Sequence, residues 1–206
     1  MRKGRVDAIT DGVMGVAMTL LVLDLRPDFH SPDDLASQLR ELWPSFAAYL
    51  VSFIVVGAIW LNHYHLFRLA IDVDHHVIVY NLMLLFFVTA IPFTTAAYAA
   101  YLLGDVNNAR LSVILYCIAM EGAAVSLMLM LEHLLRAGLM GDGLSPQQAR
   151  DLKKLYRWRI VMYLAIMVVG LIKPLAMLVL YLVSVAILVR PLMRTLTLNL
   201  MPEQQV

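Results

Sequence analysis

Long runs of apolar residues, separated by short polar stretches, recur along the whole chain. A helix needs roughly 20 mostly apolar residues to cross about 30 Å of hydrocarbon. Six segments meet or approach this length, and they cover residues 8–25, 43–67, 77–103, 111–135, 155–172 and 175–190. Lys173 and Pro174 separate the last two, which indicates a helical hairpin whose first helix begins within the polar stretch after Pro146. The pattern therefore predicts an all-helical membrane protein with six transmembrane helices per subunit.

The composition excludes a soluble domain. Of the 206 residues, 61% are hydrophobic and only 15% are charged, whereas an average protein is roughly 45–50% apolar. The mean hydropathy is +0.76. A net charge of +1 provides no basic field for nucleic acid. We therefore expect a single membrane domain over residues 1–206, surrounded by the lipid bilayer and without a nucleic-acid partner.

The basic residues between the helices are divided unevenly between the two sides of the membrane. With an even number of crossings, one side holds the N-terminus and most of the 16 lysines and arginines. The other side holds Arg26, Arg40, Arg110 and Lys173. Because cytoplasmic loops carry the excess of basic residues, both termini are predicted to lie in the cytoplasm.

The first helix combines small, polar and aliphatic residues. At about 100° per residue, one stripe along it consists of Arg5, Ile9, Gly12, Val16, Leu20 and Leu23. Thr19 lies at the margin of this stripe, whereas Thr10 and Asp11 point elsewhere. Aliphatic residues at such spacing usually face lipid or neighbouring helices, but Gly12 and Gly15 also permit close helix contacts. Asp11 is expected either to form a polar clamp with neighbouring helices or to act directly in transport.

The start of this helix resembles the first-helix signature of a channel family. It reads Arg5-Val-Asp-Ala-Ile9-Thr10-Asp11 and runs into Thr19-Leu-Leu-Val-Leu23, whereas the family pattern is Arg-x-x-x-Phe-Ser-Asp. The stretch from Trp60 to His63 is similar to the family's Trp-x-x-His. In the third helix, the stretch from Asn81 to Pro92-Phe93 is also similar to the corresponding part of the family. The family comprises the potassium channels of endosomes and lysosomes typified by transmembrane protein 175, together with their prokaryotic homologues.

The resemblance implies a homotetramer in which four copies of the first helix line a central pore. Carried over by the motif, the hydrophobic constriction falls on Val16, Leu20 and Leu23, with Thr19 as a hydroxyl-bearing layer. A polar network for assembly or gating falls on Arg5, Thr10, Asp11, Trp60, His63 and Asn81. The implied protein is a potassium-selective channel of a prokaryotic cell membrane. Its partner is itself, and it needs no cofactor beside the permeant potassium ion.

Rings of aliphatic side chains would make a narrow and poorly wetted throat. The sequence contains no Thr-Val-Gly-Tyr-Gly segment for a filter of backbone carbonyls. An ion would cross the throat by shedding part of its hydration shell, which costs potassium less than sodium, and the throat could close by dewetting. Val16 is shorter than the aliphatic residue expected there, so the throat is expected to be wider at that layer. Asp24 is either an outer acidic ring that attracts cations or a solvated helix end.

Glu121 supports an alternative function. It lies in the middle of the fourth span, where an ionisable residue is costly and no basic residue of the same span pairs with it. A proton- or cation-coupled secondary transporter could use such a group, although the two halves of the chain show no convincing repeat. A structural membrane protein is the third class, and it would conduct nothing and tolerate polar residues along the first-helix stripe.

The histidines do not predict an enzyme. Several titratable residues would gather near the cytoplasmic face, namely His63, His65, His75, His76, His133, Asp72 and Asp74. A membrane di-iron oxygenase needs several histidine pairs at spacings such as i and i+4, and the chain lacks them. We therefore predict no catalytic residue and no metal site. These histidines are expected to form interfacial hydrogen bonds, with pH sensing as a second role.

Overall fold

The computed structural model describes residues 3–25, 34–141 and 144–200, with side chains up to residue 187. Within these ranges the chain forms helices only, apart from one short bridge between loops. The helices are α1 (Lys3–Leu20), the 3₁₀ turn η1 (Leu21–Asp24), α2 (Leu35–Glu41), α3 (Trp43–Leu69), α4 (His75–Tyr101), α5 (Val106–Arg136), α6 (Pro146–Ile172) and α7 (Pro174–Leu200).

Polar side chains set where three of the long helices begin. The Asp74 carboxylate accepts a hydrogen bond from the Val77 N–H at the start of α4, and Asp105 accepts from two N–H groups at the start of α5. Ser145 and Gln148 form a reciprocal capping box at the start of α6. Such caps satisfy N–H groups that have no partner within the helix. For this reason α4, α5 and α6 begin before the apolar segments predicted at residues 77, 111 and 155.

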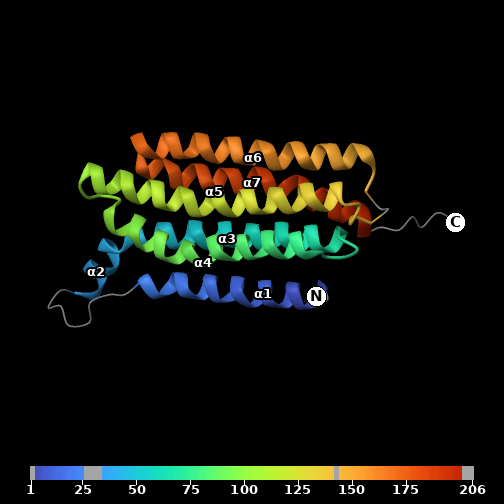
Figure 1. The fold of residues 1–206 in the computed structure, drawn as a ribbon. Coiled ribbons are helices and arrows are strands. Elements are labelled where there is room, and N and C mark those ends of the chain that lie inside the picture. The colour runs from blue at the N-terminus through green and yellow to red at the C-terminus, as the bar shows by residue number, and fades with distance from the viewer. Residues whose placement is uncertain (1–2, 26–33, 142–143, 201–206) are drawn as a thin grey trace.

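The long helices lie side by side and roughly antiparallel (Figure 1). α1 forms one edge of the bundle and packs against α3 and α4, while α5, α6 and α7 form the opposite side. The N-terminus, the α3–α4 loop and the α5–α6 loop lie at one end, which we call the N-terminal end (Figure 1). The short α2, absent from the prediction, lies at the other end. An antiparallel bridge between Ala70 and Met140 joins the two loops at the N-terminal end.

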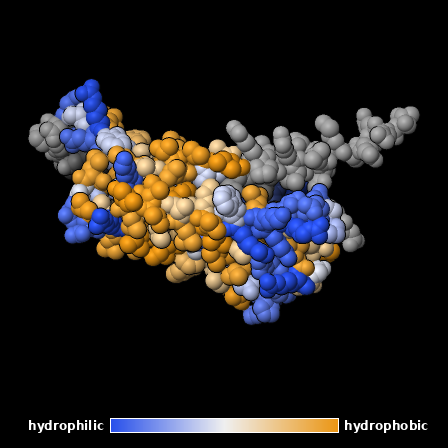
Figure 2. Space-filling view, turned by 90° about the horizontal axis from the view of Figure 1, so that it is seen from above, coloured by the Kyte–Doolittle hydropathy of each residue, from blue (hydrophilic) through white to orange (hydrophobic). Residues whose placement is uncertain are grey.

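The surface of the bundle is that of a membrane protein. Among the described residues, five helical segments are long and apolar enough to cross a bilayer, and Pro174–Ile187 is a shorter apolar segment. Figure 2 shows, from the side on which α6 lies, a broad apolar surface between hydrophilic ends. Exposed side chains on α6 include Trp158, Val161 and Ile172, which suits contact with lipid. The chain is therefore a multi-pass membrane protein.

Candidate pore helix and its polar network

One face of α1 anchors the helix to the rest of the subunit. Its buried residues are Val6, Thr10, Met14 and Ala17, and the series continues with Leu21 in η1. These positions recur every three or four residues, which is the spacing of one helical face. They pack against α3 and α4. In the described part of the subunit, no side chain on the opposite face of α1 is buried, and we call this opposite face the free face of α1.

The predicted constriction residues all lie on this second face. The exposed fractions of Val16, Leu20 and Leu23 are 57%, 42% and 47%, although all three are aliphatic. Thr19 is exposed beside them, and its hydroxyl donates a hydrogen bond to the Val16 carbonyl at 2.8 Å. Since the hydroxyl hydrogen is used in this way, the oxygen keeps its lone pairs for another donor or a cation.

The last turn of the helix is tighter than the prediction assumed. Residues 21–24 form a 3₁₀ turn rather than a continued α-helix. In 3₁₀ geometry, residues three apart lie directly above one another. The change therefore brings Leu23 closer to the line of Leu20 than a spacing of 100° would. Asp24 is exposed at the end of this turn.

Three side chains from α1, α3 and α4 form a buried chain of hydrogen bonds. The Asn81 amide donates from Nδ2 to the Thr10 hydroxyl at 2.8 Å. His63 Nε2 lies 3.0 Å from Asn81 Oδ1, and because an amide oxygen only accepts, Nε2 donates. The exposed fractions of the three residues are at most 2%. Sequence reasoning had named all three, and the structure brings them into direct contact.

A second polar contact links α1 to α3. The Trp60 indole N–H donates to the Asp11 carboxylate at 2.7 Å. Nδ1 of His63 lies 4.0 Å from the Asp7 carboxylate but makes no hydrogen bond with any described group. Arg5 is the exception among the predicted network residues, since it is exposed and makes no hydrogen bond or ion pair within the described part of the chain. Arg5 belongs to the same free face as Val16.

Gly12 and Gly15 of α1 are not needed for packing within the described part of the subunit. A Cβ atom built on Gly12 or Gly15 would meet no other atom within 4 Å. Gly170 of α6 is a contrast, because a Cβ there would lie 2.9 Å from the Met177 sulfur and 3.1 Å from Val113. The small residues of α1 thus leave open space on its free face instead of serving a close contact inside the bundle.

Glu121 has a charged neighbour that the sequence did not reveal. Its Oε2 atom is buried without a hydrogen-bond partner in the described structure. Arg159 of α6 is the basic group that acts on it electrostatically, although the two form no ion pair within 4.0 Å. The Arg159 guanidinium instead lies over the Tyr156 ring, 4.4 Å from its centroid, and donates weakly to the Ala124 carbonyl. Three hydroxyl side chains of the same helix form hydrogen bonds elsewhere: Ser112 with Ala109, Ser126 with Gly122 and Tyr116 with Ser52.

Sequence reasoning also missed a polar cluster deep in the bundle. The Ser52 hydroxyl lies 2.8 Å from the Thr95 hydroxyl and 3.1 Å from that of Tyr116, so the cluster joins α3, α4 and α5. Thr95 also donates to the Ile91 carbonyl at 2.7 Å, next to Pro92. The available signal was the presence of hydroxyl side chains inside apolar spans, where they usually bond to neighbouring helices. The cluster ties α3 and α4, the two helices that pack against α1, to α5.

Comparisons with known proteins agree with this architecture. The family model described as "Endosomal/lysosomal potassium channel TMEM175" matches residues 5–92, which include the whole polar network. A potassium channel of Streptomyces collinus is 39% identical over 140 residues, covering 68% of each chain. A vertebrate relative, described as the endosomal/lysosomal proton channel TMEM175 of Rattus norvegicus, is 31% identical over 125 residues, 54% of this chain and 25% of its own.

A solved structure extends the match from the first helices to the whole fold. It is described as the crystal structure of a lysosomal potassium-selective channel TMEM175 homolog from Chamaesiphon minutus. The similarity covers 92% of this chain and 97% of that one, with a TM-score of 0.81 and 29% sequence identity. Motif, sequence and fold thus agree, and they place this protein in the TMEM175 family of ion channels.

Proposed function

We propose that this protein is a potassium-selective channel of the cell membrane, built as a homotetramer whose four α1 helices surround the ion path. The observation that carries the proposal is the free face of α1. This face has a row of exposed aliphatic side chains, whereas the opposite face provides the packing against α3 and α4. The relatives named as potassium channels support the choice of ion.

A throat of aliphatic rings accounts for a preference among cations. Leu20 and Leu23 offer no polar atom to an ion, so an ion that passes them must give up part of its hydration shell. Potassium loses water at lower cost than sodium because its charge is spread over a larger radius. The 3₁₀ turn aligns the two leucine layers, which lengthens the region of poor wetting. Such a throat also closes without a moving lid, by dewetting.

Polar groups flank the proposed throat. The Thr19 hydroxyl donates to the Val16 carbonyl, so its oxygen is oriented as an acceptor that can replace lost water. Asp24 stands exposed at the far end of η1 and would supply a ring of carboxylates at the outer mouth. Asp24 is assigned to the outer mouth because the predicted orientation puts the N-terminal end of the bundle, at the other end of α1, in the cytoplasm.

The polar network is proposed to hold α1 in position rather than to conduct ions. Thr10, Asn81 and His63 are buried on the side of α1 that faces the other helices, away from Val16 and Leu20. The Trp60 contact fixes Asp11 in the same region of the helix. Buried polar groups that satisfy one another specify a single arrangement of their helices. The network would therefore set the register of α1 in the assembled channel.

A modification experiment tests the proposed pore. In a Cys117→Ala background, Leu20→Cys is exposed to a water-soluble, positively charged thiol reagent while liposomes conduct potassium. The reagent should label the cysteine and block the flux, because a permanent charge in the throat repels cations. Leu164→Cys on α6 is the matched control, since Leu164 is 45% exposed and Leu20 is 42% exposed. Flux that persists after Leu20→Cys has been treated would place the ion path elsewhere.

Coupled transport that uses Glu121 is a second candidate function. The specific observation is the buried and unpartnered carboxylate oxygen of Glu121, with Arg159 as a charged neighbour. A transporter that uses Glu121 would lose its activity in Glu121→Gln, because the amide binds no proton. The proposed channel should keep its passive potassium flux in this variant. Flux in liposomes distinguishes the two functions when the proton gradient is first set and then collapsed by a protonophore.

A further inference from the structure

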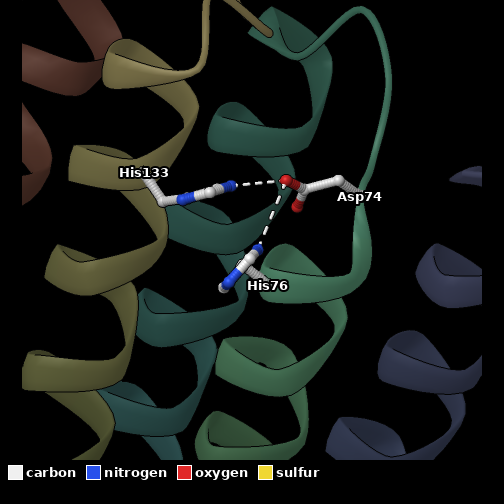
Figure 3. Close-up of side chains that lie close together, drawn as sticks. All are labelled: Asp74, His76 and His133. Atoms are coloured by element: carbon white, nitrogen blue, oxygen red, sulfur yellow. Dashed lines mark hydrogen bonds and ion pairs between the residues drawn. The ribbon is translucent and has the colours of Figure 1, made fainter.

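Three potential metal ligands converge at the N-terminal end of the bundle, away from the free face of α1. Figure 3 shows the side chains of His76 and His133 directed at the carboxylate of Asp74. Asp74 precedes α4, His76 lies in its first turn, and His133 comes from the last turn of α5, 59 residues further along the chain than Asp74. One ligand atom from each residue lies within 4.8 Å of the others.

The helix cap fixes how Asp74 presents its carboxylate. Oδ1 accepts the hydrogen bond from the Val77 N–H at 3.0 Å, so this atom is already used by the backbone. Oδ2 faces the histidines and lies 2.6 Å from His133 Nε2 and 3.7 Å from His76 Nδ1. A backbone partner that holds one carboxylate oxygen orients the other, as in many metal sites. The carboxylate is therefore directed at both rings before any ion arrives.

The ligand set and the spacing suit a transition metal. Zinc binds histidine nitrogen and carboxylate oxygen at about 2.0–2.2 Å, so ligand atoms around a tetrahedral ion lie about 3.4 Å apart. The Asp74–His76 separation is close to this value. The Asp74–His133 hydrogen bond is shorter and would open by less than an ångström when the ion replaced its hydrogen. His76 is exposed, so an ion and a water ligand have access to the site.

We propose that Asp74, His76 and His133 bind one divalent transition-metal ion of the zinc class per subunit. The fourth position of a tetrahedral ion would be left to water. The bound ion would clamp the start of α4 to the end of α5. Asn81 follows His76 on α4, so the clamp acts on the helix that carries the hydrogen bond to Thr10 of the pore helix.

Zinc binding to the purified full chain tests this proposal without any measurement of ion conduction. Isothermal titration of the protein in detergent with zinc chloride should show one saturable site per subunit. His76→Ala should weaken the affinity at least about tenfold, because one of three ligands is lost. His75→Ala is the matched control, since it removes an exposed neighbouring histidine that is not one of the three ligands. Magnesium should not compete, because it prefers oxygen ligands.

Two further variants separate loss of a ligand from loss of structure. Asp74→Asn keeps a side-chain acceptor for the α4 cap but removes the anionic ligand, so its binding should weaken while its elution in size-exclusion chromatography is unchanged. His133→Ala should have the same effect. The proposal is wrong if the unmodified protein shows no saturable zinc binding. It is equally wrong if His76→Ala binds zinc as tightly as His75→Ala does.

Discussion

At the residue scale, the buried Thr10 hydroxyl is one of the polar groups that connect the candidate pore helix to the rest of the subunit. It accepts from Asn81 and donates to the Val6 carbonyl, 2.9 Å away. The sequence could identify Thr10 because it stands beside Asp11 in the family motif. It could not show that Arg5 would be left out of the network, because a motif fixes residue types but not which of them touch.

Replacement of Thr10 by valine should destabilise the protein. Valine has nearly the same shape but leaves the Asn81 amide without its buried partner, which costs about 1–3 kcal/mol. Thermal unfolding followed by size-exclusion chromatography should show a lower transition temperature for Thr10→Val. Thr10→Ser, which keeps the hydroxyl, should stay close to the unmodified protein. Equal transition temperatures of the valine and serine variants would show that the hydrogen bond does not contribute to the stability of the protein.

At the scale of the secondary-structure element, α1 has one face that packs within the subunit and a free face that is exposed. The periodicity of its sequence was enough to predict which residues share the free face, because one α-helical turn has a fixed geometry. The 3₁₀ turn at Leu21–Asp24 was beyond such reasoning, which assumed one helical repeat throughout. The charged neighbour of Glu121 could not be predicted from the sequence for another reason. Arg159 belongs to a different helix, and helix pairing does not follow from the hydropathy of each helix alone.

The width of the proposed throat should depend on Leu23. In the proposed tetramer, Leu23→Ala removes three carbons from each of the four side chains of one ring, so potassium flux should rise several-fold and the preference over sodium should fall, as ions keep more of their water. The measurement is the flux of each ion into liposomes that hold equal amounts of protein. Leu164→Ala is the matched control on α6, with 45% exposure against 47% for Leu23. An unchanged flux and preference in Leu23→Ala would move the constriction away from this layer.

For the whole molecule, hydropathy predicted an all-helical membrane protein and the approximate position of each long helix, because burial in lipid demands a fixed length of apolar chain. It did not predict contacts between distant parts of the chain. His133 meets Asp74 only because α4 and α5 run antiparallel with their ends in register, and the Ala70–Met140 bridge holds the loops at the same end. The spacing of the histidines therefore argued against a di-iron centre, but it could not show that Asp74, His76 and His133 come together in the fold.

Cation flux through the purified protein in liposomes is the most direct test of the proposed function. Potassium and sodium gradients are compared at equal size, with a protonophore present to remove any coupling to proton movement. A passive channel with a hydrophobic throat should carry potassium rapidly, carry sodium more slowly, and need no proton gradient. Equal fluxes of the two ions, or potassium movement that stops when the proton gradient collapses, would contradict the proposed selective channel.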